Sequence, residues 1–314
     1  MDKFKVIYMS GGAEFTLPPL KVLIESSKVN LLYTYTKTPR PAGRGKKIKD
    51  TPILEYLKNH NLDCRCPTDF KNNEEVSFIK NMQTDFILVF SYGLILPKQI
   101  IEAPKYGCIN IHPSLLPKWR GPSPIQYSLL NNEKETGFCF MEMQEGIDTG
   151  DILLKRKVDI KQSDNSLTLL NKISATASLF IEKVFIEIIQ NKITKNKQDH
   201  SQATYSYKIE KKDTMINFEE EALQILGKIK AFAPNPCARC YINGEIVKIF
   251  DAEVINNNKK YDKSGIVLDH KLLISCGIGA IRLLKIQREG KKVLSANEVL
   301  NGWRVEPGTK INAN

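Results

Sequence analysis

The sequence lacks any long hydrophobic run: no stretch approaches the roughly 18 apolar residues that a membrane-spanning helix needs. It also lacks a leader-like segment, because an apolar strand-like run begins almost at once, at Phe4. These two absences predict a cytoplasmic protein with no membrane partner.

Cysteines with metal-site spacing are also scarce. There are seven cysteines in 314 residues, an odd number in a chain long enough to bury a core without disulfides, so we expect reduced thiols. Cys64 and Cys66 are too close for the usual zinc pair. Cys237 and Cys240 have suitable spacing but no second pair and no nearby histidine. We therefore expect no metal.

The charge is unevenly distributed. The net charge is +11, and residues 1–50 carry +6, residues 51–150 carry −3 and residues 201–314 carry +5. Basic ends around a slightly acidic middle suit a polyanionic partner that touches two separate regions. Lysines that serve only solubility would give the same totals, so composition leaves both interpretations open.

The first two hundred residues alternate strand-like and helix-like segments. This order predicts an α/β fold with a doubly wound, mostly parallel, Rossmann-like sheet. The strands are expected at Phe4–Met9, Val29–Thr34, Phe86–Phe90, Cys108–His112 and Gly137–Met143. The helices are expected at Leu17–Ser26, Pro52–Asn59, Asn73–Met82 and Ser166–Gln190.

The remaining residues predict a second, smaller domain. Residues 191–208 are polar and without apolar periodicity, which is typical of a linker. A helix at Ala222–Phe232 and several short strands follow, and these favour a small OB-like β-barrel. The strands are expected at Ala238–Ile242, Glu245–Ala252, Ser264–Leu268, Lys271–Ser275 and Ala280–Gln287. The predicted domains are thus 1–190 (catalytic) and 209–314, joined by the linker 191–208.

Candidate chemistry is concentrated between Tyr106 and Pro117. Side chains alternate across a strand, so Cys108, Asn110 and His112 share one face, with the last two at the carboxyl end, where open α/β sheets bind ligands. An uncharged amide and imidazole suit the polarisation of a carbonyl and the stabilisation of an oxyanion. The same residues could instead satisfy backbone groups at the strand end.

Asp148 is the third candidate. It lies between Gly146 and Gly150 after a predicted strand, on a tight loop that can reach His112 if the two strands are neighbours. From there it could orient the imidazole and accept a proton. A solvent-facing turn explains the same Asp and Gly residues.

Residues 37–49, the basic segment, contain six basic and no acidic side chains. Prolines and glycines keep the segment from being helical, so we expect an exposed loop that binds phosphates, with an ordinary surface loop as the alternative. We name four of its side chains the loop cations: Arg40, Arg44, Lys46 and Lys47.

Together these motifs resemble the methionyl-tRNA formyltransferase family over essentially the whole chain. The strongest part is Asn110–Pro117, followed by Trp119–Gly121 and Gly146–Gly150. The wider group of 10-formyltetrahydrofolate-dependent formyltransferases shares the Asn, the His and the Asp. The basic segment and the C-terminal β domain narrow the resemblance to the tRNA enzymes. One departure is Ser10–Ala13, because the family often carries Gly-Thr-Pro after the first strand.

The resemblance implies formyl transfer from 10-formyltetrahydrofolate to the α-amino group of methionine on initiator tRNA, without a metal. It implies that Asn110 and His112 stabilise the oxyanion, and that Asp148 orients His112 and moves the ammonium proton. The loop cations and the C-terminal domain would contact the tRNA, and we expect the enzyme to be a monomer. The implied folate pocket comprises Phe90, Tyr92, Gly93, Leu94, Ile95, Ser114, Leu115, Leu116, Pro117, Gln144, Gly146 and Ile147.

Two other functions stay open at this point. A formyltransferase for a sugar nucleotide or a purine precursor would keep the catalytic residues but would not require the basic segment. A tRNA-binding protein that has lost catalysis would keep the basic segment but would have no use for Asn110, His112 and Asp148.

Overall fold

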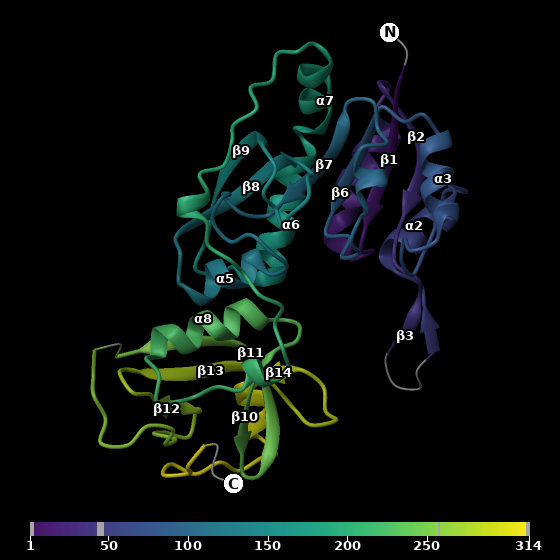
Figure 1. Ribbon diagram of the computed structural model, residues 1–314. Helices are drawn as coiled ribbons and strands as arrows, with labels where there is room; N and C mark the ends of the chain where they lie inside the picture. Colours follow the sequence, from purple (N-terminus) through teal and green to yellow (C-terminus); the bar gives the residue numbers. More distant parts are fainter. Residues whose placement is uncertain (1–2, 43–46, 257, 312–314) are drawn as a thin grey trace. The chain divides into compact units, whose positions relative to one another are not determined.

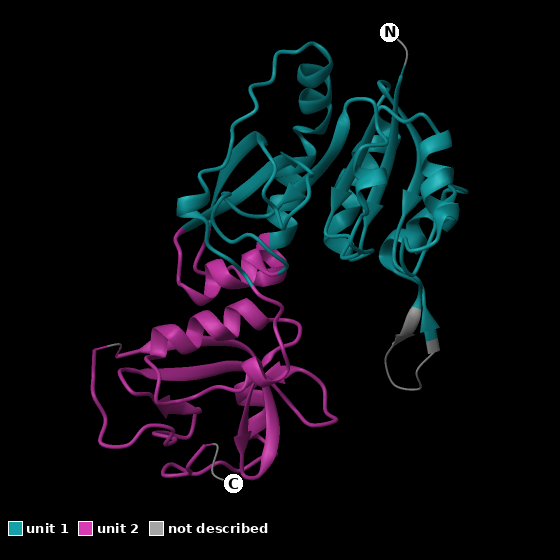
Figure 2. Ribbon diagram, viewed as in Figure 1, with its two compact units in different colours: residues 1–122, 135–159, 170–206 teal, residues 123–134, 160–169, 207–314 magenta. Residues whose placement is uncertain are grey.

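The computed structural model describes residues 3–42, 47–256 and 258–311 of the chain. The residues form two compact units (Figure 2): unit 1 contains residues 1–122, 135–159 and 170–206, and unit 2 contains residues 123–134, 160–169 and 207–314. Within the described ranges, no helix is long and apolar enough to cross a membrane.

Unit 1 is built on a seven-stranded sheet with the order β5-β2-β1-β6-β7-β8-β9 (Figure 1). Its strands are β1 (Phe4–Ser10), β2 (Val29–Tyr35), β5 (Cys64–Arg65), β6 (Phe86–Phe90), β7 (Gly107–His112), β8 (Glu135–Glu142) and β9 (Ile152–Asp159). Neighbouring strands from β5 to β7 are parallel, and β8 and β9 extend the sheet antiparallel. The predicted mostly parallel sheet is confirmed.

Helices cover both faces of this sheet, and its central strand β6 is accordingly apolar and buried at every position. On one face, the ring of Phe86 in β6 stacks on Phe185 at a centroid distance of 4.2 Å. On the other face, Ile87 packs in a core cluster with Val76 and Ile79. The helices of this part of the chain are α1 (Leu17–Glu25), α2 (Pro52–Asn59), α3 (Asn73–Asn81), α4 (Lys98–Ile101), α6 (Ser166–Ser178) and α7 (Ile181–Ile189), with a short 3-10 turn at Glu14–Thr16.

The single helix predicted over Ser166–Gln190 is wrong, because the structure contains two helices, α6 and α7. Near the end of α6, the hydroxyls of Thr176 and Ser178 donate to carbonyls four residues earlier, at 2.8 and 2.7 Å, a pattern that loosens a helix. Phe180 then packs beside Phe138 of β8, at a centroid distance of 6.1 Å. Tertiary packing therefore interrupts a segment whose apolar pattern is continuous.

The basic segment is only partly a loop, in contrast to the expectation. Strands β3 (Arg40–Ala42) and β4 (Lys47–Lys49) pair antiparallel as a hairpin that extends from unit 1 (Figure 1). Because both strands of a two-stranded ribbon are edge strands, Pro41 is tolerated there despite its missing N–H. Residues 43–46 lie outside the described part of the chain.

Unit 2 carries a five-stranded antiparallel sheet and confirms the small C-terminal β domain. Its strands are β10 (Ala238–Ile242), β11 (Glu245–Ile255), β12 (Leu273–Ser275), β13 (Ala280–Arg288) and β14 (Leu294–Ser295), and its helices are α5 (Pro124–Leu130), α8 (Ala222–Phe232) and α9 (Ala296–Leu300), with a 3-10 turn at Lys212–Thr214. The turn between β10 and β11 has positive φ at both Asn243 (51°) and Gly244 (75°), the conformation that an Asn-Gly hairpin favours. The strand expected at Ser264–Leu268 is wrong, because only Ile266 and Val267 form isolated bridges.

The polar segment 191–208, expected as a linker, is packed against unit 1 as far as residue 206. Asn196 forms a two-way backbone bridge with Ile152, at 2.8 and 2.9 Å. A short 3-10 turn follows at His200–Gln202, and the backbones of Thr204 and Ser206 then bond to Arg120, at 2.9 and 2.7 Å. These contacts place the segment beside Arg120, in the loop that follows β7.

Candidate active site

Asn110 and His112 lie on β7, between parallel β6 and antiparallel β8. They share a face with Cys108, whose thiol is 3.6 Å from the sulfur of Met143. The structure therefore has the predicted alternation. His112 is buried, whereas Asn110 is half-buried, and none of the described residues hydrogen-bonds to its side-chain amide. That amide is available to a ligand.

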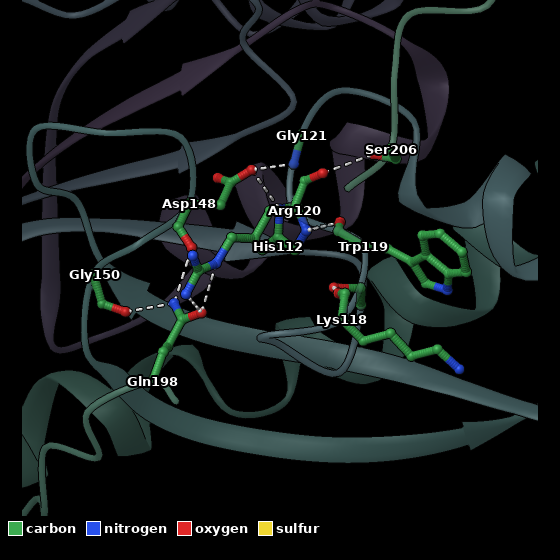
Figure 3. Close-up of polar contacts among 10 residues, drawn as sticks. His112, Lys118, Trp119, Arg120, Gly121, Asp148, Gly150, Gln198 and Ser206 are labelled. Carbon is green, nitrogen blue, oxygen red and sulfur yellow. Dashed lines mark hydrogen bonds and ion pairs between the residues drawn. The ribbon is translucent and has the colours of Figure 1, made fainter. Parts of the chain in front are cut away.

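His112 contacts an oxygen atom through each of its ring nitrogens (Figure 3). Nε2 is 3.0 Å from the carbonyl oxygen of Trp119, and Nδ1 is 3.5 Å from Oδ2 of Asp148. A carbonyl only accepts, so Nε2 carries a proton. A neutral imidazole carries no second proton for Nδ1. Nδ1 of a neutral ring is therefore an acceptor, and a hydrogen bond between it and the Asp148 carboxylate needs one further proton.

The loop after β7 brings the Trp119 carbonyl to the histidine. Ser114 is fully buried, and its hydroxyl donates to the carbonyl of Lys118 at 2.6 Å, which closes a tight turn. Trp119 then has a φ of 58°, an unusual value for a residue with a bulky side chain. Two residues after Trp119, the N–H of Gly121 donates to Oδ2 of Asp148 at 2.8 Å.

The loop that carries Asp148 depends on glycine and on an unusual backbone conformation. Asp148 itself has a φ of 50°. A side chain at Gly150 would place its Cβ 1.8 Å from the carbonyl oxygen of Glu142, so only glycine fits there. The loop therefore returns close to β8, and the predicted approach of Asp148 to His112 is found.

Sequence reasoning missed three polar residues behind this pair. Arg120 is 1% exposed, and its guanidinium donates to Oε1 of Gln198 from Nε and Nη2, at 3.0 and 2.7 Å. Its Nη1 is 3.2 Å from Nδ1 of His200. Gln198 in turn donates to the carbonyl oxygens of Asp148 and Gly150 (Figure 3). Arg120 stands in a recognised motif, but no local signal marked Gln198 within its polar segment.

The residues expected to bind folate differ in exposure. Ile95 and Ile147 are 93% and 66% exposed, although both are large and apolar. In contrast, Leu116 is packed in a core cluster, and the ring of Phe90 lies edge-on to Phe15 at 5.6 Å. Tyr92 and Ser114 are buried, Leu94, Leu115 and Pro117 are half-buried, and Gly93, Gln144 and Gly146 are exposed. Among the buried members, the Tyr92 hydroxyl has no hydrogen-bond partner in the described residues.

At the departure from the family pattern, Ser10–Ala13, the chain packs closely against the segment after β6. The N–H of Gly11 donates to the carbonyl of Ser91 at 2.9 Å, and a Cβ on Gly11 would lie 2.4 Å from the same oxygen. Ser91 and Gly93 both have positive φ, 53° and 73°. Glycine at position 11 thus lets the first strand's loop approach the segment after β6.

The remaining predicted sites are described only in part. Arg44 and Lys46 lie outside the described residues, and Arg40 and Lys47 are placed on the hairpin by their backbone alone. Among the described residues, no group of three or more His, Cys, Asp or Glu side chains could hold a metal ion. The sulfurs of Cys64 and Cys66 are 3.9 Å apart, and the Cys64 hydrogen bond lowers the pKa of Cys66 to about 7.

Comparison with known proteins assigns both halves of the chain to one family. Residues 4–185 match the family described as "Formyl transferase", and residues 208–304 match "Formyl transferase, C-terminal domain". The methionyl-tRNA formyltransferase of Pelagibacter ubique is 40% identical over 309 residues, covering 98% of each chain. That of Rickettsia africae is 36% identical over 307 residues, covering 98% of this chain and 99% of its own.

Solved structures share the fold. An N-formyltransferase of Helicobacter canadensis, in complex with folinic acid and dTDP-3-aminofucose, has a TM-score of 0.64 at 20% identity and covers 92% of this chain and all of its own. HypX of Aquifex aeolicus, in complex with tetrahydrofolic acid, has a TM-score of 0.61 at 15% identity. It matches 97% of this chain, which spans half of HypX. By its full-length similarity to curated relatives, the chain belongs to the methionyl-tRNA formyltransferase family.

Proposed function

We propose that this protein transfers the formyl group of 10-formyltetrahydrofolate to the α-amino group of methionine on initiator tRNA. One observation carries the proposal: the available Asn110 amide lies on the same strand face as the His112–Asp148 pair. The end-to-end similarity to methionyl-tRNA formyltransferases supports this choice of acceptor. We also propose that the protein acts in the cytoplasm as a monomer.

The residues around Asn110 fit a folate. Ile95 and Ile147 expose apolar surface on the two loops that follow β6 and β8, and Gly93 is exposed two residues before Ile95. Flat, partly apolar ligands with polar edges are bound by such combinations of apolar side chains and backbone groups. When bound, 10-formyltetrahydrofolate supplies a formyl carbon attached to a nitrogen that can leave.

Asn110 is the residue that we assign to the oxyanion. Its amide donates to the formyl oxygen as the amine attacks and that oxygen becomes negative. The Nε2 proton of His112 is already donated to the Trp119 carbonyl. We therefore assign the oxyanion contact to Asn110 and proton transfer to His112 with Asp148, instead of giving His112 both roles.

The His112–Asp148 pair accepts the proton of the attacking group. An α-amino group has an ordinary pKa of roughly 8, so at neutral pH much of it is an ammonium that must lose a proton before attack. The pair takes that proton and returns it to the nitrogen that leaves as the bond to the formyl carbon breaks. The products are N-formylmethionyl-tRNA and tetrahydrofolate.

We propose that the loop cations and unit 2 bind the tRNA. The basic segment carries six positive charges within thirteen residues, and residues 201–314 carry a net charge of +5. The hairpin of β3 and β4 extends the basic segment from the sheet, where cations can reach phosphates (Figure 1).

The acceptor is tested by comparing three candidate substrates side by side. The purified protein is incubated with 10-formyltetrahydrofolate and, separately, with methionylated initiator tRNA, the same tRNA uncharged, or a dTDP-linked amino sugar. Formylation of the methionylated tRNA alone supports the proposal. Preferred formylation of the amino sugar, or tRNA binding without any formyl transfer, would contradict it.

A further inference from the structure

The side chain of Gln198 is buried within an otherwise mostly exposed polar segment. It is 6% exposed, and its amide makes four hydrogen bonds. Its Oε1 accepts twice from Arg120, at 3.0 and 2.7 Å. Its Nε2 donates to the carbonyl oxygens of Asp148 at 2.9 Å and Gly150 at 2.7 Å (Figure 3). All donors and acceptors of the amide are thus used.

The two carbonyls bound by Gln198 belong to the loop that orients the Asp148 carboxylate. With a φ of 50°, Asp148 occupies a region that a residue with a Cβ enters only when its surroundings hold it there. Gly121 holds the carboxylate, and Gln198 holds the main chain on either side of Thr149. The direction of the carboxylate toward His112 therefore depends on both contacts.

We propose that Gln198 is a positioning residue, which acts through the main chain of Asp148 to keep its carboxylate beside Nδ1 of His112. Arg120 holds Gln198 in turn, because the guanidinium fixes Oε1 and so directs Nε2 at the two carbonyls. This inference rests on the proposed role of Asp148 in proton transfer.

Gln198→Glu removes the donor function and adds a negative charge beside Arg120. Glutamate has the shape of glutamine and keeps an acceptor for Arg120, but it replaces the donating Nε2 by an oxygen that faces two carbonyls. We expect the single-turnover rate at saturating substrates to fall by about 10²-fold, since displacement of a reacting group by about 1 Å costs that much. The KM for tRNA and the affinity for folate should change less than threefold.

Gln202→Glu is the matched control. Gln202 lies on the same segment and undergoes the same chemical change, but it is exposed and donates only to Asp199 among the described residues. We expect its rate to stay within twofold of the unchanged protein. Tetrahydrofolate titration of each variant counts the folded sites, so that a loss of active protein is not mistaken for a slower reaction.

Combining Gln198→Glu with Asp148→Asn separates positioning from general support of the fold. If Gln198 acts through Asp148, the double variant is no slower than Asp148→Asn alone. The rate of Gln198→Glu should then also fail to recover at pH 9, as we expect for Asp148→Asn. The inference would be overturned if the rate losses of the two single variants multiply in the double variant. It would also be overturned if Gln198→Glu reacts at nearly the rate of the unchanged protein. Asp148→Asn at full rate would instead refute the proposed role of Asp148. Gln198→Asn, which keeps the amide one methylene short, provides a second variant if Gln198→Glu folds poorly.

Discussion

Replacing Asn110 by alanine should separate catalysis from folding. The lost amide is the one that we assign to the developing oxyanion, and one such donor contributes about 2.7–4 kcal/mol to the transition state, or about 10²–10³ in rate. Stability should hardly change, because Asn110 is half-buried and no described residue hydrogen-bonds to its side chain. We expect a change within about 0.5 kcal/mol, or about 1–2 °C in melting temperature.

The assay is single-turnover formylation of methionylated initiator tRNA at saturating folate, with folate affinity measured by titration and stability by thermal melting. Asn81→Ala, at an exposed position of α3, is the control for loss of an asparagine side chain. Folate affinity should stay within about threefold, because the contact strengthens mainly in the transition state. A rate within tenfold of the unchanged protein would remove Asn110 from the mechanism. A melting temperature lowered by many degrees would show instead that its amide supports the strand.

Three further predictions follow from the same structure. Asp148→Asn keeps the shape that accepts from Gly121 but cannot take up a proton, so the rate should fall by about 10²–10⁴ and should not recover at pH 9, where the amine is neutral. Recovery at pH 9 would mean that Asp148 only tunes the amine. Replacing all four loop cations by alanine should weaken tRNA binding and lower the log–log salt slope by about 0.7–0.9 per lost phosphate contact, with folate affinity unchanged. An unchanged slope would identify an ordinary surface loop. The thiolate is the form of cysteine that reacts with iodoacetamide, and the pKa of Cys66 is lowered to about 7. The rate at which iodoacetamide labels Cys66 should therefore be half-maximal near pH 7 and constant above pH 8. A midpoint near pH 8.5 would contradict this.

Local sequence signals predicted the elements whose ends are set by neighbouring residues. Helix α2 was predicted at its observed bounds, Pro52–Asn59, because a proline suits the first helical position and Thr51 caps the helix by accepting from the Leu54 N–H at 3.2 Å. The turn at Asn243–Gly244 was equally local. The break between α6 and α7 was missed because the Phe180 ring packs beside Phe138, a strand residue 42 positions earlier in the chain.

The candidate site divides in the same way. The sequence by itself placed Asn110 and His112 on one strand face, since alternation is a property of the chain over a few residues, and it identified Asp148 through a compact glycine-flanked motif. Only the tertiary structure decided which atoms meet. The Trp119 carbonyl reaches His112 through a backbone conformation that no pattern predicted, and Gln198 reaches the Asp148 carbonyl across 50 residues of sequence. Contacts of that separation depend on how the segments after β7, β8 and α7 pack together, and periodicity carries no information about such packing.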